Sequence, residues 1–206
     1  GYNFGHIENC RNLADVVTYH GVYVGGITGY NNSTETCVVA NCYNAGNITS
    51  GRYAVGGITG VNYNLVKECV NTGNVITANI CTNYNDDSKH SLAGGITGTM
   101  NGRIENCINY GTVSSYEKVG GLSGSLALVT GASFIYKNDV INSINLGIVY
   151  SKNQALCGAI GGESGTNGNL TGSYWDAQLL PISAIAGLSS DGLNGANTNI
   201  LTSGEA

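Results

Sequence analysis

VGGITG at residues 55–60, followed by VKECVNTGNV at residues 66–75, decides the fold because both blocks recur along the chain. The first block returns at residues 24–29, 93–98 and 119–124 and, as CGAIGG, at 157–162. The second returns at residues 7–16, 39–48, 104–113 and 140–149, and ends as LTGSYWD at 170–176. Self-similarity at a short, nearly fixed period is the signature of a repeat architecture.

The spacing of these blocks gives a unit of about 26 to 27 residues. Gly and Asn interrupt each unit too often for two useful helices, whereas three short strands joined by turns fit it well. Stacking the units in register predicts an all-β protein, a parallel β-helix (β-solenoid) of about six rungs. The usual handedness of parallel crossovers predicts that it is right-handed. Two longer units predict loop insertions at about 78–91 and 125–137.

Positions that recur once per rung form the predicted ladders. The apolar ladders are Ile27, Ile58, Ile96, Leu122 and Ile160; Ile7, Val39, Val66, Ile104, Val140 and Leu170; and Val16, Ile48, Val75, Val113 and Val149. Because the second ladder and the cysteine three residues later both point inward, a bend is expected between them. Gly46, Gly73, Gly111 and Gly147 are expected to supply a positive φ at a corner. Asn12, Asn44, Asn71, Asn109 and Asn145 are expected to hydrogen-bond along the stack.

The seven cysteines cannot all pair within one chain. Cys10, Cys42, Cys69 and Cys107 share one repeat position, which Ser143 and Ser173 occupy in the last two units. Such recurrence favours reduced thiols packed in the core. A disulfide and a zinc site stay open as alternatives, although the chain has no C-x-x-C pair. Cys37, Cys81 and Cys157 lie outside this ladder, and Cys81, in an insertion, is the best candidate for an exposed reactive thiol.

Composition narrows the classes of function. The 206 residues include 32 Gly and only 10% charged residues, and the net charge is −5. This balance gives no electrostatic footprint for nucleic acid or an anionic membrane, and no apolar run reaches the length of a membrane span. Since H-E-x-x-H is absent, no metallopeptidase site is expected in this segment. We expect neither a metal nor another cofactor.

The alternating blocks resemble GLUG-motif repeats, a family named for the sequence Gly-Leu-x-Gly. The motif is matched at residues 121–124, and Ile replaces Leu at 26–29, 57–60 and 95–98. SYWD at residues 173–176 also resembles the way in which such arrays end. The resemblance covers residues 1–176, although CGAIGG departs from the motif. It implies a bacterial secreted or surface-anchored protein, either adhesin-like or the accessory region of an IgA-cleaving metallopeptidase, and no catalytic residues.

Residues 1–176 are therefore predicted to form a repeat domain, and 177–206 a C-terminal cap and linker. Aligning GYNFGHIENC at residues 1–10 with residues 98–107 places the start in the middle of a rung. We therefore expect neighbouring domains of a larger chain as partners.

The function that these features favour is a non-catalytic, rigid spacer or an adhesive surface for host protein or glycan, located extracellularly or on the cell surface. Contacts are expected at Tyr84, Asp86 and Asp87 in the first insertion and at exposed tyrosines. These tyrosines are Tyr30, Tyr43, Tyr63, Tyr110 and Tyr116, for which stacking along the strands is the alternative interpretation. The pair Asp86–Asp87 keeps a glycan-acting enzyme open as a second hypothesis. The regular ladder of Thr28, Thr59 and Thr97 offers a third, an ice-binding surface.

Overall fold

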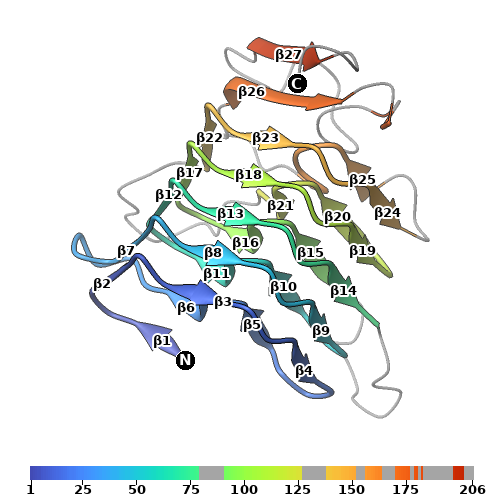
Figure 1. Ribbon diagram of the computed structural model, residues 1–206. Coiled ribbons are helices and arrows are strands. Elements are labelled where there is room, and N and C mark those ends of the chain that lie inside the picture. Colours follow the sequence, from blue (N-terminus) through green and yellow to red (C-terminus); the bar gives the residue numbers. More distant parts are fainter. Residues whose placement is uncertain are drawn as a thin grey trace.

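The chain winds into a parallel β-helix in which short strands of successive rungs lie one above another (Figure 1). This computed structural model describes residues 1–78, 91–126, 138–151, 156–163, 170–176, 179–180, 182 and 197–201. Every strand pair joins parallel strands, and most pairs bring together the same position of adjacent repeats, such as Val39 with Val66 and Val66 with Ile104. The predicted fold class, a parallel β-helix, is confirmed.

Each complete rung contributes five short strands, where three were expected. The first sheet holds β1 (Tyr2–Asn3), β6 (Thr28–Asn31), β11 (Thr59–Asn62), β16 (Thr97–Met100) and β21 (Ser123–Ser125). The second holds β5 (Tyr23–Gly25), β10 (Ala54–Gly56), β15 (Leu92–Gly94), β20 (Lys118–Gly120) and β25 (Cys157–Gly158). The extra strands arise because the glycine-rich block and the cysteine-containing block each form two strands around a bend.

The third sheet runs up one side of the solenoid and returns through its last strands. Its first half is β2 (His6–Glu8), β7 (Val38–Ala40), β12 (Leu65–Lys67), β17 (Arg103–Glu105), β22 (Asp139–Ile141) and β26 (Leu170–Asp176). Its second half is β23 (Ile144–Asn145), β18 (Ile108–Asn109), β13 (Val70–Asn71), β8 (Tyr43–Asn44) and β3 (Arg11–Asn12). The fourth sheet is β4 (Val16–Thr18), β9 (Ile48–Ser50), β14 (Val75–Thr77), β19 (Val113–Ser115) and β24 (Val149–Ser151).

The three predicted apolar ladders line the interior. Their members are buried, except that Ile7, Val16 and Ile27 in the first rung are partly exposed. A fourth interior ladder, not foreseen, is Val24, Val55, Ala93, Val119 and Cys157. Burying each large aliphatic side chain contributes about 1.5–3 kcal/mol, so these ladders are the main source of stability.

The expected bend before the cysteine position is present and lies at one residue per rung. Asn9, Asn41, Glu68, Asn106 and Asn142 all adopt the left-handed conformation, with φ between 47° and 56°. Asn tolerates this region better than most residues. Because the bend changes the direction of the chain between two consecutive strands, two residues that are three positions apart, such as Ile104 and Cys107, can both point their side chains into the core.

The expected reason for the glycines at 46, 73, 111 and 147 is wrong, because none of them has a positive φ. Their role is close packing between rungs. A Cβ atom added to Gly73 would lie 2.0 Å from the carbonyl oxygen of Gly46, and one added to Gly111 would lie 2.0 Å from that of Gly73. A side chain here would therefore push neighbouring rungs apart.

Close packing also explains the first and last glycines of the VGGITG block. A Cβ on Gly56 would lie 2.0 Å from the Thr59 carbonyl oxygen, and one on Gly98 would lie 2.4 Å from the Val55 nitrogen. The first and second sheets thus approach each other backbone to backbone. This approach buries Thr28, Thr59 and Thr97. The expectation of an exposed threonine ladder is wrong, and these hydroxyls cannot form an ice-binding surface.

Asparagine side chains form the predicted hydrogen-bonded ladder. Each amide donates to the Oδ1 atom of the next rung, from Asn12 through Asn44, Asn71 and Asn109 to Asn145, at 2.7–2.8 Å. A second ladder, not foreseen, runs from Asn3 through Asn31 to Asn62. Because nearly all of these amides are buried, the two ladders satisfy polar groups that would otherwise be costly to bury.

The described residues end with β26 and a further strand, β27 (Asn197–Leu201), that pairs with it in parallel. This strand lies within the predicted cap and linker, for which no strand was expected. Most of the two insertions, residues 79–90 and 127–137, lies outside the described residues. In the part of the chain that the structure describes, no helix has the length and apolar character needed to cross a membrane.

Candidate functional site

One side of the solenoid carries no charged residue over four rungs. It is formed by residues 43–50, 70–77, 108–116 and 144–151, whose sequences lack Asp, Glu, Lys and Arg entirely. We call it the uncharged side. Figure 1 shows its strands, β8, β13, β18 and β23, stacked in order and continuing into β9, β14, β19 and β24.

Alternation along the strands divides these segments into inward and outward residues. In β14 and β24 the first and third residues are buried and the middle residue is exposed. The outward residues of the fourth sheet are therefore Val17, Thr49, Ile76, Ser114 and Tyr150, paired in register. This row contains only aliphatic, hydroxyl and aromatic side chains.

Large apolar groups are exposed on the uncharged side, mostly in its last two rungs. Tyr110, Tyr116, Ile148 and Tyr150 each keep about half of their surface exposed (49–56%). Large apolar side chains gathered on one uncharged surface are typical of contact surfaces for other molecules.

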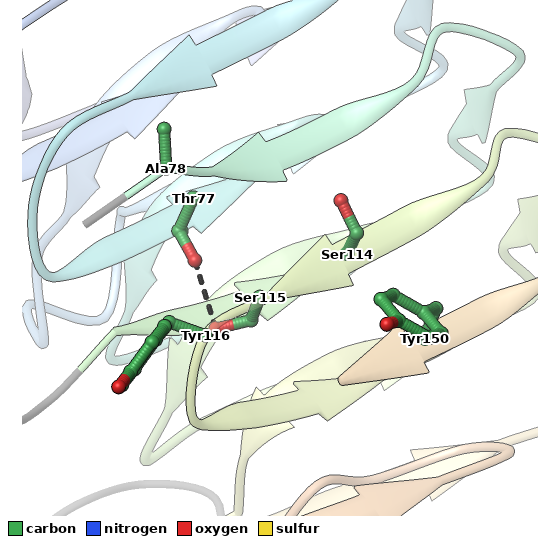
Figure 2. A pocket seen from close by; sticks show the side chains of 6 residues that line it. All are labelled: Thr77, Ala78, Ser114, Ser115, Tyr116 and Tyr150. Atoms are coloured by element: carbon green, nitrogen blue, oxygen red, sulfur yellow. Dashed lines mark hydrogen bonds between the residues drawn. The ribbon is translucent and has the colours of Figure 1, made fainter. Parts of the chain in front are cut away.

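A shallow pocket of about 180 Å³ lies on the fourth sheet at this side (Figure 2). Its lining consists of Thr77, Ala78, Ser114, Ser115, Tyr116 and Tyr150. Figure 2 shows the two tyrosine rings on either side of the Ser114–Ser115 segment. Inside the wall, Thr77 Oγ1 donates to Ser115 Oγ at 2.8 Å, and Ser115 Oγ donates to the Ser91 carbonyl oxygen at 2.8 Å. These bonds hold Thr77 and Ser115 in place beneath the pocket, and the two tyrosines stand at its sides.

The sequence named some of these residues and missed others. Tyr110 and Tyr116 are exposed as expected, whereas Tyr150 was not considered. Tyr43, expected to be exposed, is half-buried, and its hydroxyl lies 3.0 Å from Thr72 Oγ1. Tyr84, Asp86 and Asp87 lie outside the described residues, so their roles stay predictions. The absence of charge in four aligned segments is the sequence signal that could have located this side.

The other two tyrosines predicted to make contacts, Tyr30 and Tyr63, belong to a separate cluster near the first rungs. Tyr30 and Tyr63, expected to be exposed, are half-buried and pack ring against ring at 5.2 Å, while Tyr2 and Tyr30 lie 4.8 Å apart. The alternative interpretation, stacking along the strands, therefore describes Tyr30 and Tyr63. Burial and the neighbouring phenols raise the pKa of Tyr30 to about 12.

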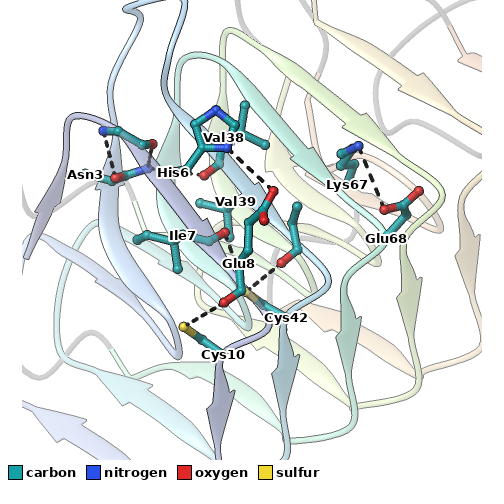
Figure 3. A network of polar contacts seen from close by, with 12 residues as sticks. Asn3, His6, Ile7, Glu8, Cys10, Val38, Val39, Cys42, Lys67 and Glu68 are labelled. Carbon is teal, nitrogen blue, oxygen red and sulfur yellow. Dashed lines mark hydrogen bonds and ion pairs between the residues drawn. The ribbon is translucent and has the colours of Figure 1, made fainter.

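The thiol ladder is a structural feature of the core. Cys42, Cys69 and Cys107 are buried as expected, and Cys10 in the first rung is exposed. Cys10 Sγ donates to the carbonyl oxygen of Glu8 at 3.4 Å, and Cys42 Sγ donates to that of Ala40 at 3.1 Å (Figure 3). All six described cysteines carry free thiols, and Cys81 lies outside the described residues.

The repeated thiol bond explains why serine replaces cysteine in the later rungs. Cys69 donates to the carbonyl oxygen two residues earlier at 3.1 Å, and Ser143 makes the same bond at 2.8 Å. The pKa of Cys42 is raised by its interaction with the Cys69 thiol and then by burial, and the pKa of Cys69 is raised chiefly by the Cys107 thiol. These thiols stay protonated and unreactive at neutral pH.

No group of three or more His, Cys, Asp and Glu side chains that could hold a metal ion occurs among the described residues. Comparison of the chain with family models, curated proteins and solved structures finds no match.

Proposed function

We propose that this chain is a non-catalytic recognition module of a larger bacterial surface or secreted protein, of the kind that its GLUG-like repeats suggest. Stacked rungs fixed by apolar and asparagine ladders form a stiff support. Such a support holds outward side chains in fixed positions, which lowers the entropic cost of binding a partner. Its partner is a glycan or a protein outside the cell.

The observation that carries this proposal is the uncharged side. Tyr110, Ile148 and Tyr150 are exposed there, and no charged residue lies among them in the segments that form this side. Tyrosine combines a large apolar contact area with a polar tip, which suits glycan and protein surfaces. A phosphate-rich partner would instead require Lys or Arg.

The test is a binding screen of the purified chain against glycans and extracellular host proteins, with calcium and with a chelator. We expect saturable binding that weakens at least about tenfold when Tyr110 and Ile148 are both replaced by serine. Tyr19→Ser is the matched control, because Tyr19 is also exposed but lies in the first rung, outside the uncharged side. If a folded sample binds nothing in the screen, the recognition proposal is overturned and a rigid spacer is the function that remains.

Two further variants separate the alternatives. Binding that disappears when residues 78–91 are shortened, but survives the double serine variant, would move the contact surface to the first insertion. Turnover of a bound glycan that is lost in the variant Asp86→Ala, Asp87→Ala would identify a glycan-acting enzyme instead.

A further inference from the structure

The pocket on the fourth sheet has the size of a site for one small ring. Its volume of about 180 Å³ is below the range of roughly 300–1,000 Å³ that is usual for pockets enclosing a whole drug-sized ligand. It is also open and shallow, since strands β14, β19 and β24 form its floor and the tyrosines stand at its sides (Figure 2). A ligand here would insert one terminal group and leave the rest outside.

The lining selects a neutral ligand. None of the six lining residues is ionisable at neutral pH, so a carboxylate, sulfate or phosphate would lose its hydration without gaining an opposite charge. A purely apolar group fits poorly as well, because Ser114, the outward residue of β19, places its hydroxyl group in the wall.

The lining also provides two distinct kinds of contact. Tyr116 and Tyr150 each expose about half of their surface and offer aromatic faces to C–H groups. Ser114 is the middle, outward residue of β19, and its hydroxyl can both donate and accept a hydrogen bond. Thr77 and Ser115 are nearly fully buried and bonded to each other, which fixes the floor against which a ring would rest.

A pyranose ring is the small group that combines an apolar C–H face with a rim of hydroxyl groups. We propose that the pocket binds one neutral pyranose unit, the terminal sugar of a glycan, between Tyr116 and Tyr150. This inference rests on the proposed recognition function and specifies its ligand class. Exposed, preformed sites of this size bind single rings weakly, so tight attachment would need several sugars or several copies.

The experiment titrates the full chain with methyl pyranosides of glucose, galactose, mannose and N-acetylglucosamine, followed by saturation-transfer NMR and calorimetry. N-acetylneuraminic acid and glucuronic acid serve as charged probes. We expect millimolar binding of at least one neutral pyranoside and no preference for the charged sugars. Tyr116→Ala and Tyr150→Ala should each weaken binding about tenfold, while Tyr150→Phe, which keeps the ring, should change it less than about threefold.

Tyr19→Ala is the matched control, because Tyr19 is also exposed but lies in the first rung and does not line the pocket. It should change pyranoside affinity less than about twofold. Circular dichroism and the urea unfolding midpoint verify that each variant is folded.

The outcomes separate the two proposals. If the chain binds proteins or larger glycans in the screen but no methyl pyranoside, the pocket assignment is overturned and the recognition function stands. Pyranoside binding that is unchanged in Tyr116→Ala and Tyr150→Ala, or a preference for the acidic sugars, also overturns the assignment. If nothing binds, both proposals fail.

Discussion

Replacing Asn71 with alanine removes the central member of the first asparagine ladder. Its side chain is fully buried and takes part in three hydrogen bonds. Oδ1 accepts from Asn44 Nδ2 at 2.7 Å, and Nδ2 donates to Asn109 Oδ1 and to the Gly73 carbonyl oxygen, both at 2.8 Å. The substitution therefore breaks the connection between the second, third and fourth rungs without touching an apolar ladder.

The expected cost follows from these contacts. Three hydrogen bonds at about 1 kcal/mol each give a loss of about 3 kcal/mol, and the buried polar atoms left without these partners raise it to about 3–5 kcal/mol. Asn12→Ala is the matched control from the first rung. Asn12 also donates to the next rung and to Ala14, but it is partly exposed, so water can replace its partners. We expect it to cost no more than about 1.5 kcal/mol.

Urea unfolding followed by circular dichroism measures both values, from the shift of the midpoint at constant m-value. Asn71→Asp provides a second reading in the same assay. An ionised carboxylate would direct an oxygen at Asn109 Oδ1 and at the Gly73 carbonyl, so its destabilisation should grow as pH rises above about 4, where the unfolded chain loses the proton first. A decrease in the free energy of unfolding below 1 kcal/mol for Asn71→Ala, or one equal to that of Asn12→Ala, would refute the stabilisation attributed to this ladder.

Three further predictions concern the backbone, a thiol and a phenol. Gly94→Ala should destabilise the chain by several kcal/mol or prevent folding, because its Cβ would lie 2.0 Å from a carbonyl oxygen of β16. Gly5→Ala is the control, because a Cβ there would have no atom within 4 Å, and it should leave the urea unfolding midpoint nearly unchanged. Cys10 should react with an alkylating reagent in the folded chain. Cys69 should react only after unfolding, because it is buried and its pKa is raised. Peptide mass spectrometry distinguishes the two sites. Because the pKa of Tyr30 is raised to about 12, the stability that its protonated form contributes is present below pH 10 and is lost between about pH 10 and 12. Ultraviolet titration should show a late-titrating phenol that Tyr30→Phe removes, and the absence of this change would contradict the packing of Tyr30.

The interior could be predicted from the sequence because each repeat position meets its own copy in the next rung. A position that is apolar in every unit, such as Ile58 or Val66, can only be satisfied in the interior, and an asparagine in every unit finds its partner one rung away. The same argument would have found the second ladder, since Asn31 and Asn62 both stand two residues after the last glycine of their block. That ladder stops at the fourth rung, where buried Met100 takes the position.

Features that depend on distances between strands of different sheets were harder to infer. Gly56 and Gly60 are separated by only three residues, and nothing in their spacing shows that their strands pack backbone to backbone. The sequence pattern predicts a positive φ at the corner glycines, such as Gly46 and Gly73. In the structure the positive φ belongs to the residue before each cysteine, such as Asn41 and Asn106. The buried threonines follow from the same close approach.

The distribution of charge bears on the proposed role of the uncharged side. Two ion pairs of described residues lie elsewhere: Arg103 with Asp139 at 2.9 Å between β17 and β22, and Lys118 on β20 with Glu163 at 2.7 Å. In the opposite half of the third sheet, one register row begins with the exposed Arg11 in the first rung and continues with half-buried Tyr43, Val70, Ile108, Ile144 and Tyr174. The proposed neutral partner would account for tyrosine and isoleucine at successive rungs of this side. Stacking of aromatic and β-branched side chains along the strands accounts for the same residues without a partner, and binding by the serine variant of Tyr110 and Ile148 distinguishes the two explanations.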